Sequence, residues 1–155
     1  MGSAISTLKK IKTKELIECI KTQNTKKFKD IVEKDNISLN LLSESGFYLI
    51  HYAIIYYNSD ILYILCKDRN LNLDVQDNYG GTALHIAALK NNDEAYILLK
   101  ELGANDNIKT IKNYPGTCNT IHKTPYQIAD LYNYNSITCL YERITKYFPH
   151  KMVYL

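Results

Sequence analysis

The first residues of the chain have the types and the spacing that a lipid-transfer reaction requires. Gly2 follows Met1, and Ser6 stands four residues after Gly2. Met-Gly-x-x-x-Ser/Thr is the pattern of N-myristoylation, in which the free α-amino group of the glycine is acylated. A side chain at this residue would obstruct the transfer, so glycine is needed there. The pattern predicts a myristoyl group on Gly2; a chance Met-Gly-Ser start or a remnant of cloning is the alternative.

Four lysines follow this pattern at once. A single myristoyl chain binds membranes with an association constant of only roughly 10⁴ M⁻¹, so stable anchoring needs a second signal. No cysteine lies near Gly2 to carry palmitate, whereas a basic residue near an anionic leaflet contributes on the order of 1 kcal/mol. We therefore expect basic charge to be the second signal; the alternative is that these lysines form a solvated helix face. The predicted membrane-binding residues are Lys9, Lys10, Lys12 and Lys14.

Other reactive side chains are isolated from one another. The cysteines form no CxxC or CxxxH pair, so we expect buried, reduced thiols of a cytosolic protein and no zinc site. No Gly-x-Ser-x-Gly, phosphate-binding glycine loop or His-Glu-x-x-His is present. The sequence therefore predicts neither an enzyme nor a metal or cofactor site. The residues concerned are Cys19, Cys66, Cys118 and Cys139, and the isolated His122 and His150.

The elements of the chain are most clearly marked between residues 77 and 107. A turn at Gly80-Gly81 comes first, because glycine takes positive φ without steric cost. Thr82 can cap the helix that follows, Ala83–Leu89. A second helix is predicted over Asp93–Leu102, with apolar residues at helical spacing and Gly103 as its C-cap. A turn with two short helices cannot bury its apolar faces alone.

This segment resembles the ankyrin repeat. Thr82-Ala83-Leu84-His85-Ile86-Ala87 matches the family signature Thr-Pro-Leu-His-x-Ala except for its proline, and Gly103-Ala104 follows the second helix. The resemblance implies an all-α solenoid, in which each repeat is two helices joined to the next by a short hairpin loop. It also implies that His51 and His85 form hydrogen bonds between loops of neighbouring repeats.

The unit recurs along the chain. One repeat before Gly80, His85 and Ala87 stand Gly46, His51 and Ala53, and one repeat earlier again comes a degenerate copy over residues 14–34. Further along the chain, the Thr-Pro pair of the signature appears at Thr124-Pro125. End repeats are expected to be atypical because one face meets water. We predict four repeats, at about 14–42, 43–76, 77–109 and 119–148, between a flexible basic tail (1–13) and a C-terminal tail (149–155). Further helices are expected at about 60–67, 125–132 and 136–146.

The last repeat begins later than the period requires. The interval from Thr82 to Thr124 exceeds the ankyrin period of about 33 residues by roughly nine, and the extra chain lies within 108–122. Tyr114-Pro115-Gly116 has the composition of a turn at the tip of this insertion. Insertions in repeat proteins form loops on one face of the array, often the binding face. We interpret the segment as an elongated hairpin finger; a disordered loop without function is the alternative.

Charge is unevenly distributed. Residues 1–34 carry a net +5, residues 35–107 a net −6 and residues 108–155 a net +4, which together give the formal +3 of the chain. The repeats expected to form the binding face are thus acidic, so a nucleic-acid partner is not expected. No apolar run reaches the ~18–20 residues that a membrane-spanning helix needs, and no secretory signal is found.

What remains is binding to another protein. By resemblance, ankyrin repeats bind on a concave face made of hairpin tips and first helices, which is here rich in aromatic and aliphatic residues. Such residues are typical interface anchors; the alternative is that Ile55, Tyr56 and Leu131 pack against the neighbouring repeat. The predicted partner-binding residues are Glu44, Phe47, Ile55, Tyr56, Asn78, Tyr79, Leu89, Lys90, Tyr114, Ile121, Lys123 and Tyr132, with Ser45, Gly81, Thr120 and Leu131 at equivalent positions.

Two functions fit these patterns. The first is a small adaptor, held on the cytosolic face of a membrane by the myristoyl group and by lysines that bind anionic lipid. Its repeats would present a tyrosine-rich, partly acidic face to a protein. The second is a soluble ankyrin-repeat regulator that masks a partner such as a kinase or a transcription factor. Neither involves a small-molecule substrate.

Overall fold

The structure is a computed structural model that describes residues 2–139, with side chains described from residue 6. This range has no strand, only an isolated antiparallel bridge between Leu42 and Tyr48. The expected tail at 149–155, His150 and most of the helix expected over 136–146 lie outside the described residues. The helices are α1 (Gly2–Lys21), α2 (Thr25–Asp35), α3 (Leu49–Ile55), α4 (Ser59–Cys66), α5 (Ala83–Leu89), α6 (Asp93–Glu101) and α7 (Pro125–Leu131), and residues 135–139 are helical as well.

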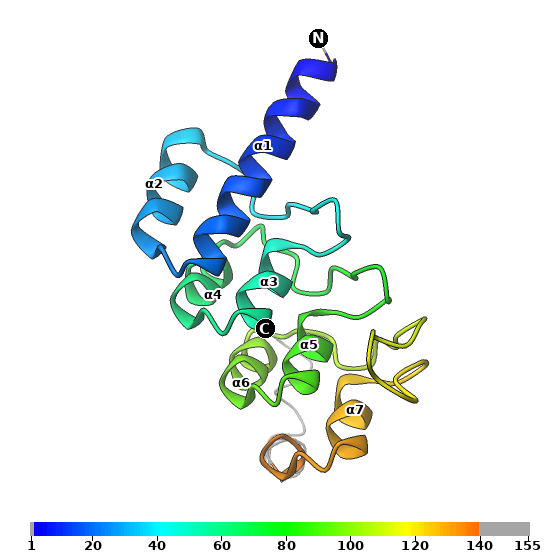
Figure 1. The fold of residues 1–155 in the computed structure, drawn as a ribbon. Coiled ribbons are helices and arrows are strands. Elements are labelled where there is room, and N and C mark those ends of the chain that lie inside the picture. Colours follow the sequence, from blue (N-terminus) through cyan, green and yellow to red (C-terminus); the bar gives the residue numbers. More distant parts are fainter. Residues whose placement is uncertain (1, 140–155) are drawn as a thin grey trace. The chain divides into compact units, whose positions relative to one another are not determined.

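The chain divides into two compact units, and the first is Met1–Asn72. Within it, α1 packs on α2 and α3, and α4 packs on α3 and α2 (Figure 1). Apolar side chains that lie at helical spacing on these elements meet in its core, which explains why such short helices are stable. Its largest fully buried side chains are Leu16, Ile20, Phe28, Leu41, Leu49, Ile50, Ile54, Ile61 and Leu65.

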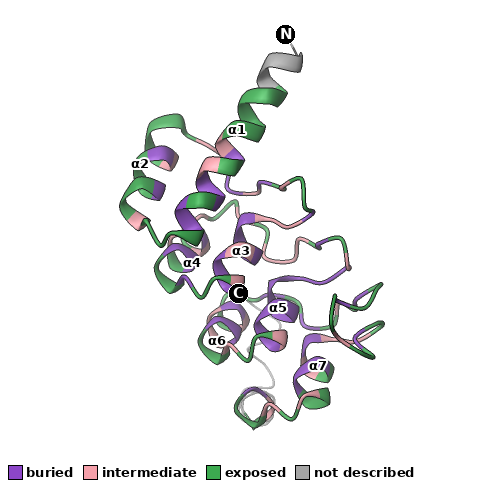
Figure 2. Cartoon of the chain, in the orientation of Figure 1, coloured by how far each residue is buried: buried purple, intermediate pink, exposed green. Residues whose placement is uncertain are grey.

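The second unit, Leu73–Leu155, is built around α5. This helix packs on both α6 and α7. Every residue from Ala83 to Ala88 is buried, and α5 is accordingly mostly purple in Figure 2. Two small residues, Ala87 and Ala88, allow the close approach of both neighbours. Leu84, Tyr96 and Leu99 are the largest fully buried side chains of this core.

The turn between the two helices of a repeat has the same chemistry three times. The side chains of Asn24, Asn58 and Asn92 cap α2, α4 and α6, each accepting a hydrogen bond from a backbone N–H three residues on. The residue before each cap takes the left-handed conformation, with φ of 49° to 55°. Asparagine is a favoured N-cap because its side-chain oxygen satisfies a free amide of the first turn. The three caps are evenly spaced along the chain, so they mark the repeat.

The sequence correctly predicted α5 from Ala83 to Leu89. Three other predicted helix ends lie one residue beyond the observed ones, since α4, α6 and α7 end at Cys66, Glu101 and Leu131. Gly80 and Gly103 take the expected positive φ of 75° and 87°. Turn and cap residues therefore determine the boundaries of these helices.

The beginning of α1 differs from the prediction. Residues 1–13 were expected to form a flexible tail, but α1 begins at Gly2 and is continuous to Lys21. No glycine or proline interrupts the sequence from Ser3 to Lys21, and Ala, Leu, Lys and Glu, all good helix formers, are frequent in it. Since the later turns are packed in the core, adding turns at the N-terminal end needs no new nucleation. Figure 1 shows these turns projecting beyond α2 and α3.

Candidate protein-binding surface

The hairpin turn before α3 is a compact polar structure in the first unit. Ser43 N–H donates to Phe47 O at 2.9 Å, and Gly46, with φ of 82°, makes the reversal possible. The Ser45 hydroxyl lies 2.9 Å from that of Ser43 and 2.6 Å from that of Tyr52. Tyr52 belongs to α3, so these hydroxyl contacts join the tip of the turn to the helix.

An aromatic row continues from this turn along α3. The ring of Phe47 meets that of Tyr52 edge-on at 6.1 Å, and Tyr52 stacks on Tyr56 at 6.3 Å. Residues 52 and 56 are four apart and so lie on one helix face. Phe47 and Tyr52 are half-buried, whereas Tyr56 is 39% exposed. The row offers a rigid aromatic surface of the kind that partners use as an anchor.

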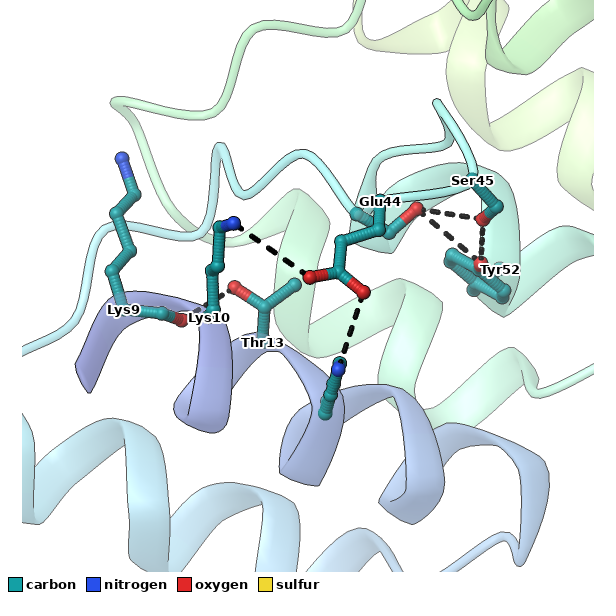
Figure 3. Close-up of polar contacts among 8 residues, drawn as sticks. Lys9, Lys10, Thr13, Glu44, Ser45 and Tyr52 are labelled. Carbon is teal, nitrogen blue, oxygen red and sulfur yellow. Dashed lines mark hydrogen bonds and ion pairs between the residues drawn. The ribbon is translucent and has the colours of Figure 1, made fainter. Parts of the chain in front are cut away.

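Glu44, at the tip of the same turn, is held by lysines of α1. Its carboxylate lies 3.8 Å from Lys10 Nζ and 3.2 Å from Lys14 Nζ, so it bridges successive turns of that helix (Figure 3). The hydrogen bond from Lys14 is the main reason why the pKa of Glu44 lies below its usual range. Glu44 thus remains exposed, as the sequence predicted, but its charge is compensated within the chain.

Lys12 is also paired, with carboxylates of two helices. Its Nζ lies 2.9 Å from Asp35 Oδ2 on α2 and 3.5 Å from Glu15 Oε2 on α1. The hydrogen bond to Asp35 raises the pKa of Lys12. Of the lysines predicted to bind membranes, only Lys9 has no ion pair among the described residues. The charge of residues 9–14 is therefore smaller than the sequence alone indicated.

In the second unit, the turn before α5 is organised by Asp77. Its Oδ1 accepts hydrogen bonds from the N–H groups of Tyr79 and Gly81, at 2.8 and 3.0 Å. Its Oδ2 accepts the Tyr114 hydroxyl at 2.8 Å. Burial raises the pKa of Asp77, and these three donors oppose that rise by stabilising the carboxylate. One buried side chain thus joins the turn to the segment that follows α6.

That segment, residues 108–123, is a hairpin, as the sequence predicted. Thr110 N–H donates to Lys123 O at 3.1 Å, and His122 N–H to Thr110 O at 3.0 Å. At its tip, Thr117 N–H donates to Tyr114 O at 3.1 Å across Pro115 and Gly116, whose φ is 73°. Proline at the second and glycine at the third position are typical of a type II turn.

The prediction that Tyr114 contacts a partner is wrong. Its side chain is only 6% exposed, because it folds back against the Asp77 turn. Its ring lies 4.9 Å from that of Tyr79, and a Cβ on Gly81 would collide with the Tyr114 hydroxyl. Thr120 and Gly81 are buried here too. The hairpin therefore presents other residues to solvent, including Ile111 and Ile121.

His85 has the role that the family resemblance implied. Its Nδ1 accepts the Thr82 N–H at 2.9 Å, and its Nε2 lies 3.1 Å from the carbonyl oxygen of Lys123. The side chain is fully buried, which lowers its pKa to about 4. His85 thus joins the start of α5 to the far end of the hairpin. In the first unit, His51 Nδ1 accepts the Tyr48 N–H in the same way, at 3.2 Å.

The remaining predicted residues divide by exposure. Half-buried side chains keep part of their surface in water, and Tyr132 among them stacks on Tyr134 at 5.8 Å. This half-burial fits both interpretations of Ile55, as a partner contact and as a packing residue. The half-buried set is Ile55, Tyr79, Leu89, Lys123 and Tyr132, and the exposed set is Ser45, Asn78, Lys90, Ile121 and Leu131.

Sequence reasoning missed two residues of this surface. Tyr52 is the centre of the aromatic row, and its spacing of four from Tyr56 was the signal that could have found it. Asp77 was assigned only to a turn, although an aspartate side chain in a turn commonly accepts a hydrogen bond from the backbone amide two residues on. The cysteine prediction also needs correction, because Cys118 and Cys139 are exposed, whereas Cys19 is buried and Cys66 is partly buried.

The described residues contain no group of three or more His, Cys, Asp or Glu side chains that could hold a metal ion. None of the helices in this part of the chain is long and apolar enough to cross a bilayer. The helix pairs and the tight turns described above define the class of protein, which is an all-α repeat protein.

The ankyrin-repeat family matches residues 15–110 in three copies, which is more than half of the chain. The protein therefore belongs to the ankyrin-repeat family, and the predicted fold class, an all-α ankyrin-repeat solenoid, is confirmed. It is a protein–protein interaction module. No curated protein matches the chain.

Proposed function

We propose that the protein is a small adaptor that is tethered to the cytosolic face of a membrane and binds a protein partner through its repeats. The aromatic row of Phe47, Tyr52 and Tyr56 carries the partner-binding part of this proposal. Aromatic side chains with few rotatable bonds lose little entropy on binding, and they bury a large apolar area. The tether rests on the Met-Gly-x-x-x-Ser pattern at Gly2 and on the lysines of α1.

The tether is tested by intact mass after co-expression with an N-myristoyltransferase. The wild-type protein should gain the mass of one myristoyl group, and the Gly2→Ala variant should not. In cells, Gly2→Ala should lower the membrane-bound fraction of the protein. Absence of the mass shift would remove the lipid anchor from the proposal and leave the protein-binding part intact.

The aromatic row is tested by comparing partner capture. Phe47→Ala combined with Tyr56→Ala should abolish capture of the partner that the wild-type protein enriches, because both substitutions remove aromatic surface next to Tyr52. The matched control is Tyr63→Ala, which removes an exposed tyrosine of α4. Equal capture by the double variant and the wild-type protein would contradict the proposed surface.

The second candidate, a soluble regulator that masks its partner, is favoured by a different observation. Lys10, Lys12 and Lys14 all pair with carboxylates of the chain itself. These pairs reduce the charge available for an anionic membrane. If this candidate is right, Gly2→Ala leaves both the location of the protein and the capture of its partner unchanged, whereas the aromatic double variant still loses capture.

A further inference from the structure

The first turns of α1 expose large apolar side chains that the proposed adaptor does not use. Leu8 is 59% exposed and Ile11 is 56% exposed. They are three residues apart and so lie on one face of the helix. In Figure 2 the described part of the projecting turns is largely green, in contrast to the turns that follow. A single exposed leucine is common on protein surfaces, but this exposed pair is bordered by lysines.

Ile11 points away from the core of its unit, whereas Leu8 is exposed because it precedes the buried turns of α1. The buried residues of α1 that follow are Thr13, Leu16, Ile17, Cys19 and Ile20. At about 3.6 residues per turn, the step from Ile11 to Ile20 corresponds to a rotation of about 180°. Packing against α2 and α3 therefore covers the opposite side of the helix and leaves Ile11 outside. The repeats therefore do not cover this pair of apolar side chains.

Lysines flank this face on both sides. Lys9 and Lys12 lie on one side of Leu8 and Ile11, and Lys10 lies on the other, as the helical periodicity places them. Residues 1–14 contain no aspartate or glutamate. Lysines that border an apolar stripe can direct their ammonium groups to phosphate while their methylene chains lie along the acyl region. Lysines that border apolar side chains are one feature of helices that lie in the plane of a membrane interface.

We infer that the N-terminal turns of α1 are an interfacial helix that inserts Leu8 and Ile11 into an anionic lipid bilayer, with the flanking lysines on the lipid headgroups. The inference deepens the proposed tether, but it requires no acylation. Charge complementarity favours the bilayer as the occupant, because residues 1–14 carry four lysines and no acid. Glu15, which follows Ile11 on the same helix face, is paired with Lys12 and Lys27. A second copy of the chain would bring like charges together along the same face.

The ion pairs with Glu44 are part of this binding. Lys10 and Lys14 are largely exposed, and exposed ion pairs are weak, so an anionic headgroup can replace Glu44 as their partner. The Glu44→Gln variant should therefore bind phosphatidylserine vesicles more tightly than the wild-type protein. Glu33→Gln, on α2, makes the same change of charge at an exposed residue without a described ion pair, and it should have a smaller effect.

The inference is tested on the full-length, unacylated protein with phosphatidylcholine vesicles that contain or lack phosphatidylserine. The wild-type protein should sediment only with the anionic vesicles. Leu8→Gln with Ile11→Gln should lower the partition coefficient by about tenfold or more, since two large apolar side chains no longer insert. Leu102→Gln with Leu131→Gln, at exposed leucines elsewhere, should leave it unchanged.

Insertion is measured directly with a fluorescent residue, because the chain has no tryptophan. Leu8→Trp should show a blue shift with anionic vesicles and quenching by lipids brominated on their acyl chains. Tyr63→Trp, on α4, should show neither. Circular dichroism and a thermal melt establish that each variant is folded, so that weak binding is not mistaken for unfolding.

Three results would overturn the inference. One is failure of the folded wild-type protein to bind anionic vesicles, and another is equal binding by the Leu8→Gln, Ile11→Gln variant. The third is a wild-type dimer in ultracentrifugation that this variant dissociates, which would make the face a contact between copies. None of these results touches acylation, which the mass of the co-expressed protein reports separately, or the aromatic row.

Discussion

His85 shows how one residue makes the stability of the fold depend on pH. It is neutral and fully buried, with its Nδ1 used as an acceptor and a pKa of about 4. In the unfolded chain, an ordinary histidine titrates near pH 6.5. As the pH falls from about 6.5 to about 4, the unfolded state therefore takes up a proton that the folded state does not. The linkage relation then requires stability to fall over this window.

The expected loss in the free energy of unfolding is roughly 3 kcal/mol between pH 7 and pH 4, from the shift of the His85 pKa. Urea unfolding at a series of pH values measures it. His85→Gln should be less stable at pH 7 and should lose less stability on acidification. His122→Asn, at an exposed residue with φ of 56°, should keep the wild-type pH dependence. An unchanged slope in His85→Gln would contradict the assignment.

Thiol reactivity provides a second prediction at this scale. Cys118 and Cys139 are exposed and should react rapidly with a disulfide reagent in the native protein. Burial raises the pKa of Cys66 to about 11, and it also raises the pKa of Cys19, so these two should react slowly. Cys118→Ser with Cys139→Ser should remove the rapid phase, and denaturant should expose both remaining thiols. A rapid phase that survives the double substitution would contradict the burial described here.

At the scale of the elements, local chemistry explains what the sequence could predict. Gly80 and Thr82 mark the start of α5, and Asn91-Asn92 marks its end, so its bounds follow from neighbouring residues alone. The N-caps at 24, 58 and 92 were equally readable from their even spacing. The beginning of α1 was missed because an exposed, lysine-rich helix has no buried partner and therefore no apolar periodicity facing a core.

Contacts between distant residues explain what could not be predicted. Tyr114 is buried because its hydroxyl reaches Asp77, 37 residues earlier. The composition of Tyr-Pro-Gly predicts the turn correctly, but it does not reveal to which side the tyrosine folds. Likewise, the ion pairs of Lys10 and Lys14 depend on where the Glu44 turn lies against α1. Charge counted along the chain therefore overestimated the basic surface.

The hairpin at 108–123 leads to a prediction for an element. Tyr114→Phe removes the hydroxyl that donates to buried Asp77, which should cost about 1–3 kcal/mol of stability. Because the same contact holds the hairpin to its neighbouring turn, hydrogen exchange should accelerate at the Ile111 and Gly81 amides. The amides of α6 should change less. Tyr134→Phe removes a hydroxyl elsewhere in the unit and serves as control; equal protection at Ile111 in both variants would contradict the proposed attachment.

For the whole molecule, the net charge of +3 does not show how strongly positive and negative charge are separated along the chain. Residues 1–34 carry +5, whereas residues 35–107 carry −6. An anionic bilayer should attract the former and repel the latter, which favours binding through α1 alone. In the tethered adaptor, a myristoyl group on Gly2 and the interfacial helix would act on the same few turns. Neither signal would then need to be strong.

This combination predicts how salt affects membrane binding. Raising the ionic strength from 0.1 to 1 M shortens the screening length from about 10 to about 3 Å, so the lysines lose most of their attraction to lipid. The acylated protein should then retain only the affinity of its myristoyl chain, roughly 10⁴ M⁻¹, together with what Leu8 and Ile11 contribute. The Gly2→Ala variant should bind anionic vesicles at low salt and retain at high salt only the weak contribution of Leu8 and Ile11. Vesicle sedimentation of both forms across a salt series measures this, and parallel release of the two would mean that the lipid contributes no independent anchoring.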